Sequence, residues 1–421
     1  MDLINENYHL KDLGYSNSDT TVEAPRHRWY FYKEGFSPNL VEQVIEISGL
    51  RKDDVILDPF NGSGTTTLTA ALKGYRSIGI EVNPFTSYLS SAKLKNANLK
   101  KFKKHKAELL SSVEKGGKSN LIGFSTFSKS DKLDKWLFND GVLNSFEGGW
   151  IYTSQIFSYN IRKLFRLALI TAAMKNCNAR RDGKCLRYRL SWKDYNFNKE
   201  SFLKSLSAQL DQMIEDIEQY PLSQNATIIN ADSRKALNDS NKVESFSLCI
   251  TSPPYLNTFD YTDIYRPELF LGKFVTNKQE LYDLRLHTVR SHVQAKWTFP
   301  TLSDFGILYN ETISQIKENR ENLMHKYIPV MIQAYFEDMF NLLKLLRPKA
   351  KKNASLWIVV SNSAYAGIEV PVDLILGDVG SKAGWYLKEI GVLRYLKKRK
   401  SKYSSNITQL RESVIIFSST K

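Results

Sequence analysis

The stretch VILDPFNGSGTT, residues 55–66, sets the expected fold. Its first residues, Val55 to Leu57, are apolar and form a run short enough for a buried strand, and an acid, Asp58, follows directly. Gly62 and Gly64 allow the backbone to turn sharply and to approach a ligand without a Cβ in the way. A buried strand that ends in an acid and a glycine turn is typical of a ligand-binding α/β unit.

The residues after the turn complete this unit. Thr65 to Leu72 predicts a helix that ends near Gly74, and its N-terminus presents free N–H groups and the positive end of the helix dipole. Ser77 to Ile80 predicts a second strand, which ends at Glu81. The order of strand, turn, helix, strand and acid indicates a βαβ unit.

The glycine turn argues against two common ligands and favours a third. It lacks the GK[ST] ending of a phosphate-binding P-loop and the third glycine of a dinucleotide-binding turn, which argues against an NTPase and against NAD binding. Asp58 would repel a pyrophosphate but suits a cationic amino group, and Glu81 is placed to accept two ribose hydroxyls. A ligand with an ammonium group and a free ribose but no phosphate is S-adenosylmethionine, which we expect as the cofactor.

A second informative stretch is FSLCITSPPY, residues 246–255. Its apolar half predicts a buried strand that runs into Thr251-Ser252-Pro253-Pro254-Tyr255. Two consecutive prolines remove two backbone donors and stiffen the chain, so the carbonyls before them have no local partner. The Ser252 hydroxyl and one such carbonyl can accept both N–H bonds of an amine, and a base stacked on the Tyr255 ring would gain roughly 1–3 kcal/mol. We therefore expect the catalytic residues to be Ser252, Pro253, Pro254 and Tyr255.

DPFNGSGTT and TSPPY together resemble the cofactor and catalytic motifs of the amino-methyltransferase family of DNA methylases, which transfer a methyl group from S-adenosylmethionine to an exocyclic base nitrogen. NATIINAD at 225–232, FSP at 36–38 and LRESVIIF at 410–417 resemble three further motifs of this family. The cofactor motif precedes the catalytic one here, whereas many related enzymes have the reverse order. The cofactor-binding residues that the resemblance implies are Ser37, Asp58, Phe60, Gly62, Gly64, Thr65, Thr66, Glu81 and Asp232.

The residue before Pro-Pro-Tyr bears on the target base. In the family that this chain resembles, Ser at this position is more typical of methylation at cytosine N4, and Asp or Asn of methylation at adenine N6. Ser252 therefore favours a site-specific, cytosine-N4 DNA methyltransferase. The adenine-N6 enzyme is the main alternative, followed by an RNA base methyltransferase and by a catalytically inactive nucleic-acid-binding protein. The target base would leave the duplex to enter the site. No covalent intermediate is needed, and Cys249 is expected in the core.

The remaining elements predict an α/β fold, a Rossmann-like methyltransferase sheet with large, mostly helical insertions. Further strands are expected at 226–229, 246–250, 356–360, 390–393 and 413–417, and further helices at 40–47, 327–346 and 370–376. We expect a discontinuous catalytic domain of residues 1–84 and 225–421. Residues 85–224 would form a mostly helical insertion that recognises the target, and 276–321 a second, smaller insertion.

Charge indicates a polyanionic partner. The 421 residues include 59 Lys and Arg against 44 Asp and Glu, a formal net charge of +15. Such a surplus favours nucleic acid, and we expect double-stranded DNA. The run Lys100 to Lys104 is expected to be a solvated helix face. The residues expected to contact DNA are Arg180, Arg181, Lys184, Arg187, Lys397, Lys398 and Arg399.

The other features are consistent with a globular protein of a reducing compartment. Hydrophobic residues make up 42% and charged residues 24%, which excludes wholesale disorder. Three cysteines and six scattered histidines show no disulfide framework and no metal-ligand spacing. The start of the chain does not resemble a signal peptide, and we expect a cytoplasmic protein without a metal or a membrane partner. The resemblance also implies pairing with a cognate restriction endonuclease.

Overall fold

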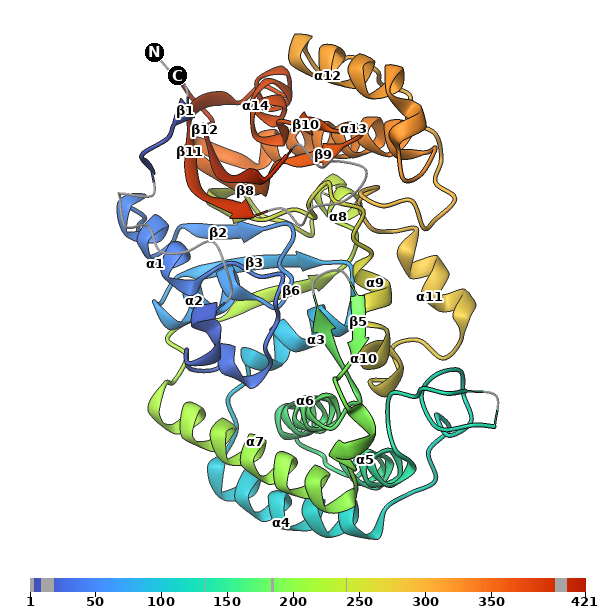
Figure 1. The fold of residues 1–421 in the computed structure, drawn as a ribbon. Helices are drawn as coiled ribbons and strands as arrows, with labels where there is room; N and C mark the ends of the chain where they lie inside the picture. The colour runs from blue at the N-terminus through green and yellow to red at the C-terminus, as the bar shows by residue number, and fades with distance from the viewer. Residues whose placement is uncertain (1–3, 9–18, 132, 183–184, 240, 398–406) are drawn as a thin grey trace.

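The computed structural model describes residues 4–8, 19–131, 133–182, 185–239, 241–397 and 407–421. Its centre is one eight-stranded sheet with the order β1-β11-β12-β8-β7-β2-β3-β6 (Figure 1). The strands, in chain order, are β1 (Ile4–Asn5), β2 (Val55–Asp58), β3 (Arg76–Glu81), β6 (Ala226–Asn230), β7 (Phe246–Thr251), β8 (Ala350–Ser361), β11 (Tyr386–Lys397) and β12 (Gln409–Ser418). The five strands from β6 to β8 are mutually parallel, and β12 pairs antiparallel with both β8 and β11. The expected strands are all present, and the α/β, Rossmann-like fold is confirmed.

The strand order places a crevice in the sheet. From β2 the chain moves outward through β3 to β6, then returns to the other side of β2 as β7 and continues to β8. The order therefore reverses between β2 and β7, and ligands of such sheets bind at the carboxyl ends of the strands next to this reversal. Both sequence stretches described above end there, β2 at Asp58 and β7 at Thr251.

Helices cover both faces of the sheet because the strand residues alternate. Ile56 packs with α1 (Pro38–Ile47) and α2 (Thr65–Leu72) on one face. Its neighbours Val55 and Leu57 pack with α8 (Ser233–Asn238), α13 (Ile328–Leu346) and α14 (Val372–Lys382) on the other face. Cys249 is fully buried in this second core, as predicted.

The chain between β3 and β6 forms a mostly helical region with its own core. It contains α3 (Pro84–Lys93), α4 (Leu99–Lys115), α5 (Asp140–Thr153), α6 (Tyr159–Lys175) and α7 (Lys199–Gln219). Figure 1 shows α4 to α7 gathered at the end of the molecule opposite α12 (Ile307–Glu318) and α14. A hairpin of β4 (Ala179–Asp182) and β5 (Cys185–Tyr188) lies between α6 and α7 in the sequence. This hairpin is antiparallel, and no strand of the region joins the main sheet within the described residues.

Shorter elements follow the β7 strand. They are α9 (Tyr261–Ile264), α10 (Arg266–Leu271) and α11 (Lys278–Arg285), and later a small hairpin of β9 (Ser363–Tyr365) and β10 (Ile368–Val370). The helix expected from residue 370 begins only at Val372, because Val370 ends β10 and Pro371 separates the two elements. None of the helices in the described ranges has the length and apolar character required to cross a bilayer.

Candidate active site

A cavity of about 310 Å³ lies at the carboxyl ends of β2, β3 and β7. The turn after β2, the end of β3, the start of α8 and the turn after β7 all contribute to its wall. The structure thus brings together residues that are far apart in the sequence. Among the sequence-predicted residues, those that line the cavity are Phe60, Gly62, Thr65, Glu81, Asp232, Ser252, Pro253, Pro254 and Tyr255.

Glu81, at the end of the strand next to β2, fixes the glycine turn through a direct hydrogen bond. The backbone N–H of Gly62, a residue at φ 47°, donates to Glu81 Oε2 at 2.8 Å. The N–H of Asn83 donates to Glu81 Oε1 at 2.8 Å. Burial raises the pKa of the Glu81 carboxyl, and these backbone donors oppose that shift. An acid held in this way presents a fixed acceptor surface at the end of β3.

Asp58 lies outside the cavity, which differs from the prediction of direct cofactor contact. The side chain is buried, and Asp58 Oδ1 accepts from the Phe60 N–H at 3.0 Å and from the Thr251 hydroxyl at 2.7 Å. Burial raises the pKa of Asp58 to about 6. The carboxyl therefore connects the turn after β2 to the turn after β7, and it acts on the site through the position of these turns.

Three other predicted cofactor residues also stand behind the wall. Gly64 adopts φ 86° at the start of α2, where an added Cβ would lie 2.7 Å from Ser90 Cβ, so it is required for the approach of α2 to α3. The Thr66 hydroxyl donates to the Ile250 carbonyl at 3.4 Å. Ser37 is buried, and its Oγ accepts from the Asn39 N–H at 3.1 Å as the N-cap of α1. None of the three lines the cavity. Their contacts are with neighbouring helices and strands of the protein and not with the cavity.

The turn after β7 is held by hydrogen bonds that leave acceptors toward the cavity. Ser252 Oγ donates to the Val359 carbonyl at 3.1 Å, so its lone pairs are available to accept from a ligand. The Leu256 carbonyl accepts from the Tyr365 hydroxyl at 2.8 Å. The Tyr255 hydroxyl is also held in place, and burial raises the pKa of this phenol.

The partner of Tyr255 is a buried acid that sequence reasoning did not assign to the site. Tyr255 donates to Glu412 Oε1 at 2.8 Å, and Arg394 Nε lies 2.5 Å from Glu412 Oε2. Both residues line the cavity. An acid next to the predicted strand Ser413 to Phe417, whose last four residues are apolar, is a signal for a buried charge, which needs a cationic partner. The partner itself lies on β11 and could not be identified without the β11–β12 register, which pairs Arg394 with Glu412.

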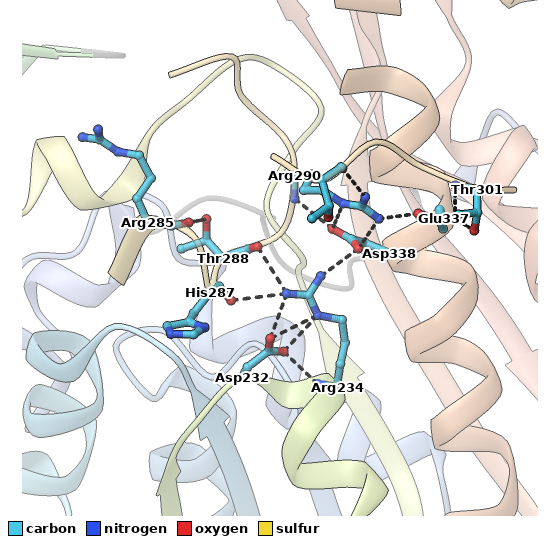
Figure 2. A network of polar contacts seen from close by, with 10 residues as sticks. Asp232, Arg234, Arg285, His287, Thr288, Arg290, Thr301, Glu337 and Asp338 are labelled. Atoms are coloured by element: carbon cyan, nitrogen blue, oxygen red, sulfur yellow. Dashed lines mark hydrogen bonds and ion pairs between the residues drawn. The ribbon is translucent and has the colours of Figure 1, made fainter. Parts of the chain in front are cut away.

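Asp232 belongs to an extended network of ion pairs (Figure 2). Arg234 Nη2 lies 2.8 Å from Asp232 Oδ2, and Arg234 Nη1 lies 2.7 Å from Asp338 Oδ1. Arg290 continues the network, with Nη2 at 2.8 Å from Asp338 Oδ1 and at 2.6 Å from Glu337 Oε2. Figure 2 shows the Arg234 guanidinium between the two aspartates. The network joins α8, α13 and the segment that carries Arg290.

This network holds the 287–290 segment at the cavity wall. Arg234 Nη2 also donates to the Thr288 carbonyl at 3.3 Å and to the His287 carbonyl at 3.4 Å, and both of these residues line the cavity. Burial raises the pKa of Glu337, but hydrogen bonds from the backbone of Leu302 and from Arg290 hold it at about 2. The expected second insertion, residues 276–321, thus contacts the candidate site through charged groups.

An aromatic cluster forms another part of the wall. Tyr32 lines the cavity and stacks on Tyr265, with ring centroids 5.0 Å apart. The Tyr265 hydroxyl donates to Glu34, an acid of the cavity wall whose pKa is raised by burial. Behind Tyr265, the Arg181 guanidinium lies 4.2 Å from the ring centroid and forms an ion pair with the buried Glu268.

The position of Arg181 corrects its expected role in DNA binding. Its side chain compensates the charge of Glu268 inside the protein, so it is not presented to a ligand at the surface. Arg180 and Lys397 are exposed, and Arg187 is exposed and pairs with Asp182 at 3.0 Å. The expected contacts Lys184, Lys398 and Arg399 lie outside the described residues.

Comparisons with known proteins place this site in context. A sequence model of the family described as DNA methylase matches residues 4–92. The Type II methyltransferase M.BsoBI of Geobacillus stearothermophilus is 29% identical over 471 residues, which cover 98% of this chain and 88% of that protein. The Type II methyltransferases M.AvaI of Nostoc sp. and M.MvaI of Kocuria varians are 25% and 22% identical, and the alignments cover 88% of this chain in both cases and 81% and 84% of the relatives. A solved structure, the rRNA methyltransferase aviRa from Streptomyces viridochromogenes, matches with TM-score 0.31 and 11% identity, over 97% of this chain and 92% of that chain.

Proposed function

We propose that this chain, which is similar to the DNA methylase family and to Type II methyltransferases, transfers a methyl group from S-adenosylmethionine to the N4 amine of a cytosine within a specific DNA site. The observation that carries this proposal is that Ser252 and Tyr255 line the same cavity as Glu81 and Asp232. The residues expected to hold the target amine therefore face the same cavity as the acids that suit a nucleoside cofactor.

The charges of the cavity wall fit a cationic nucleoside. Asp232 and Glu412 are neutralised by arginines, but Glu34 and Glu81 form no ion pair with any residue in the described part of the chain. Two partly buried acids without an ion-pair partner favour a ligand that carries positive charge over a phosphate-containing one. Glu81 would hold the ribose hydroxyls, with Asp232 and Phe60 beside the adenine. When bound, S-adenosylmethionine supplies a methyl group that its positive sulfur already activates.

The residues of this chain then have to position the amine and exclude water. Ser252 Oγ, which uses its own proton on Val359, accepts one N–H of the target amine, and a carbonyl of the proline turn accepts the other. The nitrogen lone pair is thereby directed away from the turn and toward the methyl donor. Tyr255, fixed through Glu412, offers a ring on which the flipped base stacks. Such positioning supplies most of the rate enhancement when the electrophile is already activated.

Arg394 supports cytosine over adenine as the target. Its Nε is paired with Glu412, and no other hydrogen bond of its guanidinium is found among the described residues, so the Nη groups can donate in the cavity. Beside its amine, cytosine presents two neighbouring acceptors, N3 and O2, which match the fork of a guanidinium. Adenine presents only N1 at the corresponding edge. This agrees with the expectation from Ser252.

We further propose that residues 1–84 and 225–421 form the catalytic domain and that residues 85–224 take part in target recognition, with Arg180, Arg187 and Lys397 as DNA contacts. The 276–321 segment would form part of the cofactor side of the site, since its residues Thr288 and Arg290 belong to the Asp232 network. The relatives named above are Type II methyltransferases, and a cognate restriction endonuclease is the corresponding proposed partner.

The test is to incubate the protein with S-adenosylmethionine and mixed-sequence duplex DNA, digest the DNA to nucleosides and identify methylated bases by mass spectrometry. We expect N4-methylcytosine, and we expect none from a Ser252→Ala, Tyr255→Ala variant that still binds the cofactor. N6-methyladenine would retain the reaction class but overturn the assigned base. Methylation of RNA alone would overturn the assigned substrate.

A further inference from the structure

A second cavity, of about 340 Å³, lies in the helical region outside the candidate active site. Three cationic side chains of α6 line it together with two tyrosines and a serine: Arg162, Lys163, Arg166, Tyr88, Tyr159 and Ser154. No acidic residue belongs to its wall. Nothing in the proposed reaction uses these residues.

The cations of this cavity are satisfied by neutral groups alone. Lys163 Nζ donates to Ser91 Oγ at 2.8 Å and to the Tyr159 hydroxyl at 3.2 Å. Arg166 donates through Nε to Thr153 Oγ1 at 2.9 Å and through Nη2 to Ser154 Oγ at 3.1 Å.

The third cation, Arg162, donates through Nη1 to the Ile156 carbonyl at 3.3 Å. Within the described ranges, none of these three cations forms an ion pair with a carboxylate.

Burial makes this arrangement unusual. Lys163 is only 7% exposed, and a buried cation without a counter-charge is unfavourable unless an anion joins it. Burial lowers the pKa of Lys163 to about 8 and also lowers that of Arg166. More positive charge lies nearby, since Lys95 Nζ is 5.9 Å from the Tyr159 ring centroid. Glu147 of the neighbouring α5 is already paired, with Lys273 at 2.7 Å.

We propose that this cavity binds a phosphate group of the DNA backbone. The identity of the polyanion as DNA rests on the proposed function. The geometry itself indicates an anion site, because two guanidinium groups, an ammonium group and hydroxyls converge on one cavity whose wall contains no acid. α3 links the two cavities, because Thr86 lines the candidate active site and Tyr88 lines this one. The proposal therefore requires that a duplex whose base enters the active site also extends past α3 to α6.

The test measures DNA binding by fluorescence anisotropy as a function of salt, with mixed-sequence duplex DNA and the full chain. The variant is Arg162→Gln, Lys163→Met, Arg166→Gln. The matched control, Lys101→Gln, Lys103→Gln, Lys104→Gln, removes three exposed cations of α4. Each phosphate contact contributes a slope of about −0.9 to log K against log[salt], so the loss of one contact weakens binding about eightfold at 0.1 M salt. We expect at least this change in the α6 variant and an unchanged slope in the control.

Other outcomes separate the inference from the proposed function. If the wild-type protein binds DNA in a salt-dependent manner and the α6 variant has the same slope, the phosphate site is wrong while the proposed function stands. If the wild-type protein binds no DNA, the proposed function fails first. Titration with inorganic phosphate distinguishes the source: tight binding that the variant loses, with an unchanged DNA slope, would assign the cavity to free phosphate and overturn the DNA contact. Should the triple variant lose cofactor binding, Arg162→Gln alone provides the same measurement.

Discussion

Replacing Asp58 with Asn tests whether this acid is a cofactor ligand or a link between the two turns of the active site. The hydrogen bonds that Asp58 accepts from the Phe60 N–H and from the Thr251 hydroxyl both end on Oδ1. An asparagine keeps this oxygen. Its amide nitrogen would replace the other carboxyl oxygen and can donate to the hydroxyl of Thr66, which contacts Asp58 and donates to the Ile250 carbonyl. The substitution therefore removes the titratable charge and retains the connections.

The structure gives the size and the sign of the effect on stability. Burial raises the pKa of Asp58 from 3.8 to about 6, so at neutral pH the folded state holds a charge that burial disfavours. Between these two pH values the folded state binds more protons than the unfolded state, and this group's contribution to stability is lost as pH rises through 6. The difference of 2.2 pKa units corresponds to about 3 kcal/mol. Above pH 7 we expect Asp58→Asn to be more stable by up to this amount, a rise in Tm of about 3 °C for a chain of this length.

The assay is thermal unfolding of both proteins from pH 5 to pH 8.5, together with calorimetric titration of S-adenosylmethionine. Asp54→Asn is the matched control, because a hydrogen bond from Ser247 and the charge of Lys351 lower the pKa of Asp54 to about 2, and its loss should destabilise the protein at neutral pH. If Asp58 only links the turns, cofactor affinity in Asp58→Asn stays within about threefold. A loss of about tenfold or more, about 1.4 kcal/mol, would restore the direct cofactor contact expected from the sequence and refute the interpretation of the structure.

Three further perturbations test other parts of the site. Gly64→Ala places a Cβ at φ 86°, 2.7 Å from the Cβ of Ser90 on α3, and should lower the free energy of unfolding by about 2–5 kcal/mol in chemical denaturation. The control Gly74→Ala, at φ 80° with no contact under 3.5 Å, should lower it only by the backbone strain, about 1–2 kcal/mol. The pKa of Glu337 is lowered from 4.5 to about 2, so the stability that this group contributes is present above pH 4.5 and is lost as pH falls toward 2. Arg290→Met should reduce this loss of stability between pH 4.5 and pH 2 in unfolding curves, and an unchanged loss would argue against the ion pair. Arg394→Lys should lower kcat/KM for cytosine methylation about 10–100-fold without a change in cofactor affinity; equal losses for both would indicate a structural role.

The sequence was sufficient for the sheet and for the two motifs because these depend on local patterns. The apolar strands, the glycine turn and the double proline each have a physical reason at the level of neighbouring residues, and the strand order then brought Glu81 and Ser252 to one cavity. Side-chain direction was harder to predict. Asp58 and Thr66 belong to the motif, but their side chains face the scaffold, since a buried strand end has two sides and spacing alone does not distinguish them. Arg181 was assigned to DNA for its charge, whereas its partner Glu268 is distant in sequence.

The contacts that sequence reasoning missed share one property, which bears on how the site is built. They are ion pairs between residues far apart in the sequence. Glu412 pairs with Arg394, and both residues follow β7 in the chain. Asp338 pairs with Arg234, which precedes β7, and with Arg290, which follows it. On the proposed function, the Glu412 pair lies on the target side of the cavity and the Asp338 pairs lie on the cofactor side. On the proposed function, the two central motifs supply the groups that touch the ligands, while the C-terminal half supplies the charges that fix them. Substitutions in these arginines should thus separate the two functions, with Arg394 affecting the target base and Arg290 affecting the cofactor, although neither belongs to a recognised motif.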